Sequence, residues 1–368
     1  MMASAAAAGL TIGLTVPLIS LVLQRDGVGA TLIGLNTAMS ALAIVVIAPV
    51  LPRLIGVLGT LPSMFLGIAV SAGAILLFPV FPALPAWFGL RFVLGLGMAV
   101  HWVVGEAWIN TIATEESRGR VIGTYVTLLA AGFAGGPLLV GFIGIDGATP
   151  FLVAAAIVAA AATPLAFARG VVPPMPARSP AGLVRIFRHA PTVMAAALAF
   201  GLADSPIFAL LPIYSLASGL DQRTAVEMLS VFVAGNLVSQ IPIGWLADKI
   251  DRRLILMACA AMGVAGPVAL PFAIGSPLLL WPLLFVWGGT VVGLYTVGLT
   301  LLGQRFRAAD LAGANVAFVT IYEIGSVAGP AAAGAAMDAW QPHGLVLVPA
   351  LACAAFLAVA AVRYRAAR

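Results

Sequence analysis

Long apolar segments cover almost the whole chain, and short clusters of charged, proline and glycine residues separate them. An α-helix of about 20 residues crosses the ~30 Å hydrocarbon core of a bilayer, and the segments have about this length. The runs are continuous, whereas strands of a membrane barrel alternate over about ten residues. The pattern therefore predicts an all-α polytopic membrane protein with twelve transmembrane helices. They cover residues 3–23, 30–51, 61–81, 86–112, 120–145, 149–168, 192–217, 225–247, 254–274, 277–302, 309–336 and 344–362.

The composition supports this prediction. Of the 368 residues 62% are hydrophobic and 8% are charged, and the mean hydropathy is +1.13. A soluble domain carries roughly a quarter charged residues, so a soluble enzyme and a disordered protein are both excluded. Twelve spans leave about ten residues for each connection, which is too little for a sizeable domain outside the membrane.

Few residues indicate other chemistry. The two cysteines, Cys259 and Cys353, lie in apolar runs, so we expect neither a disulfide framework nor a cysteine metal site. The first ten residues lack a positively charged start and a clear cleavage site, so we expect no removable signal peptide. The chain has no Gly-x4-Gly-Lys-Ser/Thr, His-Glu-x-x-His or Gly-x-Ser-x-Gly pattern. We therefore expect no cofactor, no ATP-driven pump and no enzyme.

A proline- and arginine-rich stretch divides the chain near its middle. We predict an N-terminal six-helix bundle at residues 1–168, a cytoplasmic linker at 169–191 and a C-terminal six-helix bundle at 192–368. The linker is the longest polar connection, and a short surface helix is expected around Leu183–His189, with its basic side toward lipid headgroups.

The basic residues predict the orientation. With both termini in the cytoplasm, 15 of the 18 Lys and Arg residues lie inside, while Arg25 and Arg223 lie outside and Arg91 begins a span. This asymmetry is what the positive-inside rule describes. It also accounts for the basic isoelectric point, so we expect no nucleic-acid partner. The expected location is the bacterial inner membrane.

The two halves resemble each other. Pro17, Ser20 and Asp26 recur as Pro212, Ser215 and Asp221 at an offset of 195 residues. The segment GFAGGPLLVG at 132–141 recurs as GSVAGPAAAG at 325–334 at an offset of 193. Matched six-helix halves are typical of transporters built from parallel repeats, with a substrate site near the bilayer midplane between the halves.

Three motifs carry a resemblance to the major facilitator superfamily over essentially the whole chain. The loop GWLADKIDRR at 244–253 is similar to the family signature Gly-x-Leu-Ala-Asp-Arg-x-Gly-Arg-Arg, although Asp251 replaces the second glycine. The corresponding loop of the first half keeps only Arg53. Helix four begins RFVLGLG, similar to Arg-x-x-x-Gly-x-Gly, and helix five fits the spacing of the antiporter motif. Strings such as GEAWIN and YEIGSVAGP look most like the YcaD-like branch.

The resemblance implies two pseudo-symmetric six-helix bundles, a monomer, and proton-driven export of a small molecule. The motif residues are expected to govern conformation, by close helix packing and by a cytoplasmic charge cluster. For the arginines alone, ordinary positive-inside anchoring is the better explanation. The motif residues are Gly123, Gly132, Gly136, Pro137, Gly141, Gly244, Asp248, Arg252, Arg253, Gly325, Gly329 and Pro330.

Three acidic residues lie inside predicted spans, where a charge is expensive unless it faces a cavity or a partner. Glu106 is the first candidate for proton coupling; the alternative is a cytoplasmic anchor bonded to Asn110 or a loop arginine. Asp204 precedes Ser205 and Pro206, so it belongs either to a broken helix lining the cavity or to a cap of a restarting helix. Glu323 binds a proton or a cationic substrate, or instead makes an interhelical hydrogen bond.

Two basic residues on helix four complete the proton-coupling candidates. His101 is either a proton relay or a packing residue, and Arg91 either takes part in coupling or snorkels to the outer interface. We also expect five aromatic and polar residues to line the substrate cavity. They are Trp102, Tyr214, Asn236, Tyr295 and Tyr322.

The eleven methionines raise the question of copper, because thioethers bind Cu(I). Copper-importing members of the resembling superfamily carry Met-x3-Met and His-x3-Met, and neither spacing occurs here. We therefore expect no metal site. The prediction is a proton-coupled exporter of a neutral, cationic or amphipathic small organic molecule. The alternatives are a proton-coupled importer of a metabolite or copper, and a membrane sensor that transports nothing.

Overall fold

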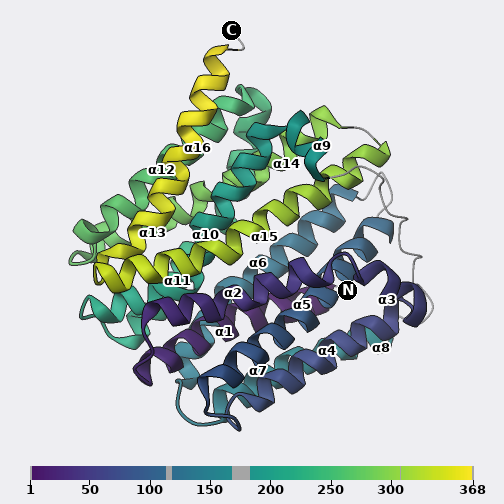
Figure 1. Cartoon of the computed structure of the whole chain (residues 1–368), viewed down its shortest axis with the longest axis vertical. Coiled ribbons are helices and arrows are strands. Elements are labelled where there is room, and N and C mark those ends of the chain that lie inside the picture. Colours follow the sequence, from purple (N-terminus) through teal and green to yellow (C-terminus); the bar gives the residue numbers. More distant parts are fainter. Residues whose placement is uncertain (1, 113–117, 168–182, 307, 367–368) are drawn as a thin grey trace. The chain divides into compact units, whose positions relative to one another are not determined.

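The computed structural model describes residues 2–112, 118–167, 183–306 and 308–366, and every regular element in these ranges is a helix (Figure 1). Twelve helical segments are long and apolar enough to span a membrane, which confirms the predicted number. The helices of the first half are α1 (Met2–Arg25), α2 (Ala30–Ile47), α3 (Leu51–Leu58), α4 (Thr60–Leu77), α5 (Leu84–Ile112), α6 (Arg118–Ile143), α7 (Thr149–Ala160) and α8 (Ala162–Ala166).

The second half begins with α9 (Leu183–His189), the short helix expected in the linker. Two predicted spans consist of paired helices, α7 with α8 and α13 with α14, separated by Ala161 and Val292. The remaining helices are α10 (Pro191–Ala217), α11 (Gln222–Lys249), α12 (Arg252–Ala273), α13 (Pro277–Val291), α14 (Gly293–Arg305), α15 (Ala308–Ala339), the 3₁₀ helix η1 (His343–Val346) and α16 (Leu347–Ala366).

The helices form two compact units. Unit 1 contains Met1–Asp26 and Met39–Ala177, and unit 2 contains Gly27–Ala38 and Arg178–Arg368. The two units correspond to the first and second halves of the sequence except at the start of α2, because Gly27–Ala38 belongs to unit 2. Most of the predicted linker lies outside the described residues.

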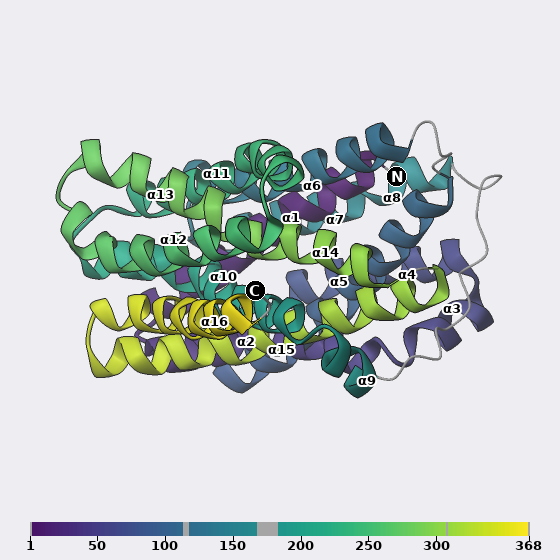
Figure 2. The same ribbon diagram turned by 90° about the horizontal axis from the view of Figure 1, so that it is seen from above.

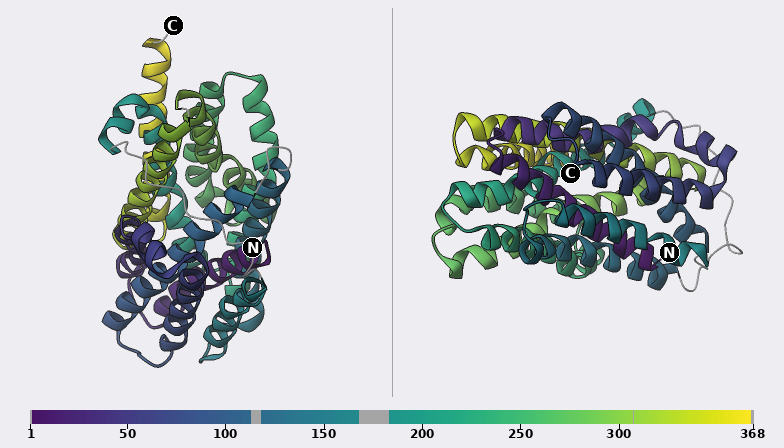
Figure 3. Two further views of the ribbon diagram at one scale, coloured as in Figure 1. Left: turned by 90° about the vertical axis from the view of Figure 1, so that its right-hand side faces the viewer. Right: turned by 90° about the horizontal axis from the view of Figure 1, so that it is seen from below.

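Unit 1 is held together by a close crossing of α1 and α6. Both helices carry glycines at the crossing: a Cβ atom on Gly9 or Gly13 would meet backbone atoms of α6, and one on Gly132 or Gly136 would meet backbone atoms of α1. Small residues allow this approach, which is how membrane helices gain packing energy. On the other side of the unit, α4 packs against α5 and α7, as the labelled ribbons in Figure 1 and the further views in Figure 3 show.

Unit 2 repeats this design with α10 and α15. A Cβ atom on Gly201 would meet the Tyr322 carbonyl of α15, and Cβ atoms on Gly325 and Gly329 would meet the backbone of α10 at Leu198–Leu202. Elsewhere in the unit, α11 lies beside α13, and α12 lies beside α16, as Figure 2 also shows. The glycine-proline segments of α6 and α15 therefore have the same packing role in their respective units.

Helix α10 runs without a break through Pro206 and Pro212. The prediction of a broken helix at Asp204 is therefore wrong, and so is the alternative that Asp204 caps a restarting helix. A membrane helix tolerates an internal proline when neighbouring helices and hydroxyl side chains compensate the freed backbone groups. Pro206 removes the helical donor of the Leu202 carbonyl, and α15 packs along this stretch with Gly329 next to that carbonyl.

Aspartates cap two helices of unit 2. Asp221 precedes α11 and accepts a hydrogen bond from the Thr224 backbone N–H, which lowers the pKa of Asp221. Asp251 precedes α12 and accepts one from the Arg253 backbone N–H. Each carboxylate satisfies an orphan donor in the first turn and favourably faces the positive end of the helix dipole.

Candidate functional site

Asp204 lies near the middle of α10, and its side chain is only 5% exposed. Its Oδ1 atom has no hydrogen-bond partner among the described residues. A buried polar group is normally paired, because leaving it unpaired costs several kcal/mol in an apolar environment. An unpartnered carboxyl within a membrane span is therefore a functional candidate.

The close crossing of α10 and α15 brings further polar groups to Asp204. Ser205 Oγ lies 3.4 Å from the Ser326 carbonyl, and Ser326 Oγ has no partner of its own in the described chain. Tyr322 and Glu323 lie on α15 at this crossing, where the Tyr322 carbonyl is next to Gly201 of α10. Glu323 forms no hydrogen bond with a described residue, so the expected interhelical bond is not formed.

Aromatic rings from α10, α14 and α15 contact one another near this crossing. Phe200 on α10 stacks on Tyr322 at a centroid distance of 5.4 Å and lies 5.7 Å from Tyr295 on α14. Tyr295 is also 5.7 Å from Tyr322 and 5.1 Å from Phe318. We call Asp204, Glu323, Tyr322, Tyr295 and Phe200 the carboxylate–aromatic cluster. Carboxylates and aromatic faces are both groups that bind cations.

Arg91 is the principal polar residue in the interior of unit 1. It lies on α5 and is 1% exposed, so the alternative of snorkelling to the interface is wrong. Its Nε atom donates to Ser40 Oγ at 3.0 Å, and Nη1 lies 3.5 Å from the Thr15 carbonyl. Nη2 has no partner, and no carboxylate of the described chain forms an ion pair with this guanidinium.

His101 lies on the same helix, ten residues or about 15 Å from Arg91. Its Nε2 atom lies 3.1 Å from Ser4 Oγ and 3.3 Å from the Ser4 carbonyl, and the Ser4 hydroxyl also donates to the Ala161 carbonyl. Nδ1 has no partner among the described residues. His101 therefore links three segments of unit 1 through one nitrogen and keeps the other free.

The remaining site candidates are Glu106, Trp102, Asn236 and Tyr214. Glu106 belongs to α5, but its side chain lies outside the described residues. The Trp102 ring lies 6.0 Å from Phe133, and Asn236 Oδ1 accepts a weak hydrogen bond from Gln240. The Tyr214 hydroxyl lies 3.2 Å from His343 Nδ1, ten residues along α10 from Asp204, so it is not part of the carboxylate–aromatic cluster.

The conformational motif residues divide into two groups. The first packs helices: Gly132, Gly136, Gly325 and Gly329 lie at the crossings, beside buried Pro137 and Pro330. In contrast, Gly141 is exposed, Gly244 faces open space, and Gly123 lies in α6 with no described surroundings.

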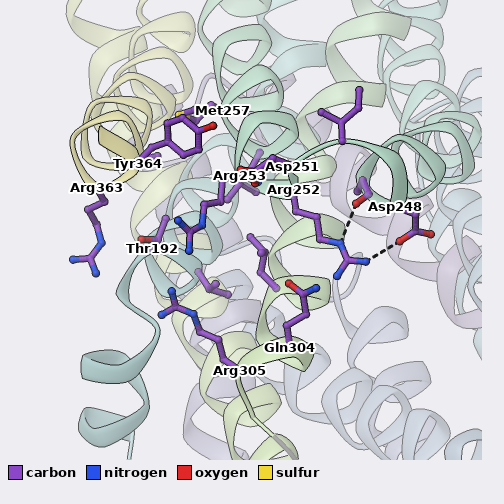
Figure 4. Close-up of a pocket in the computed structure, with 16 residues that line it drawn as sticks. Thr192, Asp248, Asp251, Arg252, Arg253, Met257, Gln304, Arg305, Arg363 and Tyr364 are labelled. Carbon is purple, nitrogen blue, oxygen red and sulfur yellow. Dashed lines mark hydrogen bonds and ion pairs between the residues drawn. The ribbon is translucent and has the colours of Figure 1, made fainter. Parts of the chain in front are cut away.

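The second group is the predicted charge cluster at the end of α11. Arg252 donates to Asp248 at 2.8 Å and to the Ala247 carbonyl at 3.0 Å, as the dashed lines in Figure 4 show. Lys249 lies over the Trp245 ring at 3.8 Å, and Arg253 has no ion-pair partner in the described chain. The cluster is thus one ion pair with two further cations, and not a continuous network.

Sequence reasoning missed the partners of the ionisable residues: Ser4, Ser40, Phe200 and His343. Serine and phenylalanine are common in membrane helices, so no local signal distinguishes these positions. Their importance follows from the helix crossings, which a single sequence does not specify.

Twelve spans, two compact units and buried ionisable groups in each unit are the features of a polytopic membrane transporter. The sequence matches the family profile of the Major Facilitator Superfamily at residues 1–234 and 224–368. The chain belongs to this superfamily.

Similar proteins agree with this assignment. The chain is 23% identical over 348 residues to the uncharacterized MFS-type transporter YfkF of Bacillus subtilis, covering 92% of this chain and 88% of YfkF. It is 26% identical over 265 residues to the uncharacterized MFS-type transporter YcaD of Escherichia fergusonii, covering 72% of this chain and 68% of YcaD. The crystal structure of a bacterial homolog of the human lysosomal transporter Spinster, inward-facing and unoccupied, matches with a TM-score of 0.78 and 13% identity over 99% of this chain and 94% of that chain. This last likeness shows the fold.

Proposed function

We propose that the protein exports a small organic molecule, cationic or neutral and amphipathic, in exchange for protons. The observation that supports this most directly is the unpartnered carboxyl of Asp204 on α10, close to the crossing with α15 where Phe200 stacks on Tyr322, the residue before Glu323. The carboxylate–aromatic cluster contains carboxylates and aromatic faces but no basic group, which favours a cation over an anion.

Exchange follows if a proton and a cationic substrate compete for the same carboxyls. A protonated Asp204 or Glu323 is neutral and holds a cation weakly, whereas the ionised carboxylate holds it strongly. Each proton taken up therefore favours release of the substrate, and each substrate bound favours release of the proton. Glu106, Arg91 and His101 are the corresponding candidates in the N-terminal half.

We further propose alternating access between an inward-open and an outward-open state. The glycine crossings give each unit a closely packed helix pair that moves as one body, and the Asp248–Arg252 ion pair supports one of the two states. In this proposal the protein acts as a monomer in the bacterial inner membrane with both termini in the cytoplasm. Reporter fusions at each terminus test the orientation.

The decisive experiment uses purified protein in liposomes with an imposed pH gradient. Pools of organic amines, drugs, metabolites and copper are offered, and uptake or efflux is measured by mass spectrometry for wild type, Asp204→Asn, Glu323→Gln and Glu106→Gln. Asp146→Asn is the matched control, because Asp146 is a surface carboxylate whose side chain is 92% accessible although it pairs with Arg25 at 3.0 Å.

We expect the imposed gradient to drive at least one compound across the membrane in the direction opposite to the protons. At least one of the three carboxyl variants should lose this proton-driven flux, and Asp146→Asn should keep it. Flux in the same direction as protons would instead establish an importer. If the pH gradient changes the uptake or efflux of no pool, in wild type or in Asp146→Asn, the proposal is contradicted and a membrane sensor is favoured.

A further inference from the structure

A second polar site lies in unit 2, away from the carboxylate–aromatic cluster. It is a cavity of about 720 Å³ at the end of the unit where α16 approaches the C-terminus (Figure 4). The start of α10, the α11–α12 connection and the ends of α14 and α16 line it. Of its lining, the proposed transport cycle uses only the Asp248–Arg252 ion pair.

Four arginines from three helices face the cavity. Arg252 is already engaged by Asp248 and by a backbone carbonyl. The other three are Arg253 at the start of α12, Arg305 at the end of α14 and Arg363 near the end of α16. None of these three forms an ion pair with a carboxylate of the described chain.

The two acidic residues of the lining do not neutralise them. Asp248 pairs with Arg252, and Asp251 caps α12 by accepting the Arg253 backbone N–H. The guanidinium of Arg305 is fixed by a 2.7 Å hydrogen bond from Nη1 to the His189 carbonyl. In Figure 4 the guanidinium groups of Arg253 and Arg305 extend toward the same part of the cavity, with that of Arg363 to their side.

Like charges that converge without a counterion repel one another, and the repulsion is relieved when an anion binds between them. Guanidinium groups match phosphate best, because two parallel N–H groups bond two phosphate oxygens. Thr192 at the start of α10 and Gln304 add polar side chains to the lining, and α10 begins without a side-chain cap. Leu256, Met257 and Leu301 form an apolar wall beside the arginines.

We propose that this cavity binds a phosphate-bearing ligand through Arg253, Arg305 and Arg363, with an apolar part of the ligand against the wall of α12 and α14. Two sources share this chemistry, the headgroup of an anionic phospholipid and a soluble phosphate or phosphate ester. The proposal concerns binding alone and is independent of the proposed transport cycle.

The test measures binding to the full-length purified protein in detergent, by calorimetry and by thermal shift. The probes are inorganic phosphate, a phosphatidylglycerol, and a diacylglycerol with the same acyl chains but no phosphate. The variant is Arg253→Gln/Arg363→Gln, which leaves Arg305 and its bond to His189 in place. The matched control is Arg53→Gln/Arg223→Gln, which removes the same charge at exposed positions outside the cavity.

We expect at least one phosphate-bearing probe to bind wild type and the control equally, and to bind the cavity variant about tenfold more weakly, because two charge-assisted contacts are lost. Binding of inorganic phosphate identifies a soluble ligand, and binding of phosphatidylglycerol alone identifies a lipid headgroup. Should the double variant fail to fold, the single variant Arg363→Gln is compared with wild type instead. We expect it to bind the phosphate-bearing probe about threefold more weakly. The proposal is overturned if neither phosphate-bearing probe binds, if diacylglycerol binds equally well, or if both double variants weaken binding alike.

Discussion

The Asp338 carboxylate caps the start of α2 through Thr31. Asp338 Oδ2 accepts the Thr31 backbone N–H at 2.8 Å and the Thr31 hydroxyl at 2.6 Å, while Oδ1 accepts the Ala30 backbone N–H at 2.9 Å. Asp338 lies near the end of α15, so this cap is supplied across 307 residues of sequence. It helps explain why Gly27–Ala38 groups with unit 2.

Replacing Asp338 by Asn should loosen the start of α2. The amide retains one acceptor oxygen but loses the negative charge that faces the positive end of the helix, a change worth about 1 kcal/mol. We therefore expect about fivefold faster hydrogen exchange in a peptide that covers residues 27–35. Asp146→Asn, which also removes an exposed carboxylate, should leave this peptide unchanged; equal exchange in both variants would show that the cap does not hold α2.

The contact also provides a test of alternating access. In protein with Cys259→Ala and Cys353→Ala, we expect the Thr31→Cys/Asp338→Cys pair to form a disulfide, because the native side chains are in contact. If the start of α2 leaves α15 during the cycle, oxidation stops transport and reduction restores it. The two single-cysteine proteins serve as controls. Full activity of the oxidised pair would mean that this contact stays closed throughout transport.

The membrane spans are the part of the fold that the sequence predicts well, because an apolar run of fixed length has one physical interpretation in a bilayer. Helix α3 shows where this reasoning stops. The sequence indicated only a loop there, yet Leu51 and Ile55 lie one turn apart and both pack into a buried cluster with Met64 and Ile68, which stabilises a short amphipathic helix.

The candidate site could be predicted only in part. A carboxyl within an apolar run is conspicuous, so Asp204 and Glu323 were identified from the sequence alone. Their proximity depends on Gly201 and Gly325, whose meeting point is decided by the packing of α10 on α15. For the same reason the sequence does not decide between coupling and snorkelling for Arg91, whereas helix packing places it in the interior with Ser40.

Gly201→Ala should destabilise the protein, although alanine normally favours a helix over glycine by about 0.5–1 kcal/mol. The added Cβ would collide with the Tyr322 carbonyl, so α10 and α15 must separate, at a cost of about 1–3 kcal/mol. Gly244→Ala is the matched control, because the same methyl group there meets open space. We expect a lower melting temperature for Gly201→Ala and an unchanged or higher one for Gly244→Ala. A Gly201→Ala protein as stable as Gly244→Ala would contradict the close crossing.

The cap of α11 should make its first turn sensitive to acid. The hydrogen bond from the Thr224 N–H lowers the pKa of Asp221 in the folded protein, so this contribution is present above the pKa of the unfolded chain and is lost as pH falls through the folded value. The protection factors of residues 222–226, which are exchange rates corrected for the intrinsic pH dependence of amide exchange, should therefore fall at acidic pH. Asp221→Asn, which caps without titrating, should keep these protection factors constant with pH, and Asp221→Ala should lower them at every pH. Identical pH profiles for wild type and Asp221→Asn would exclude the carboxylate as the cause.

The Arg91→Gln variant tests whether Arg91 serves transport or protein stability. The guanidinium is buried without a carboxylate partner, and desolvating an ion costs several kcal/mol that Ser40 and the Thr15 carbonyl offset only in part. Glutamine is shorter and neutral, so we expect Arg91→Gln to melt a few degrees higher than wild type, while proton-driven flux falls by at least about tenfold if the charge takes part in coupling. Arg53→Gln, which removes an exposed charge, should change neither quantity. A variant that melts lower and keeps its flux would show instead that Arg91 stabilises the unit and has no part in coupling.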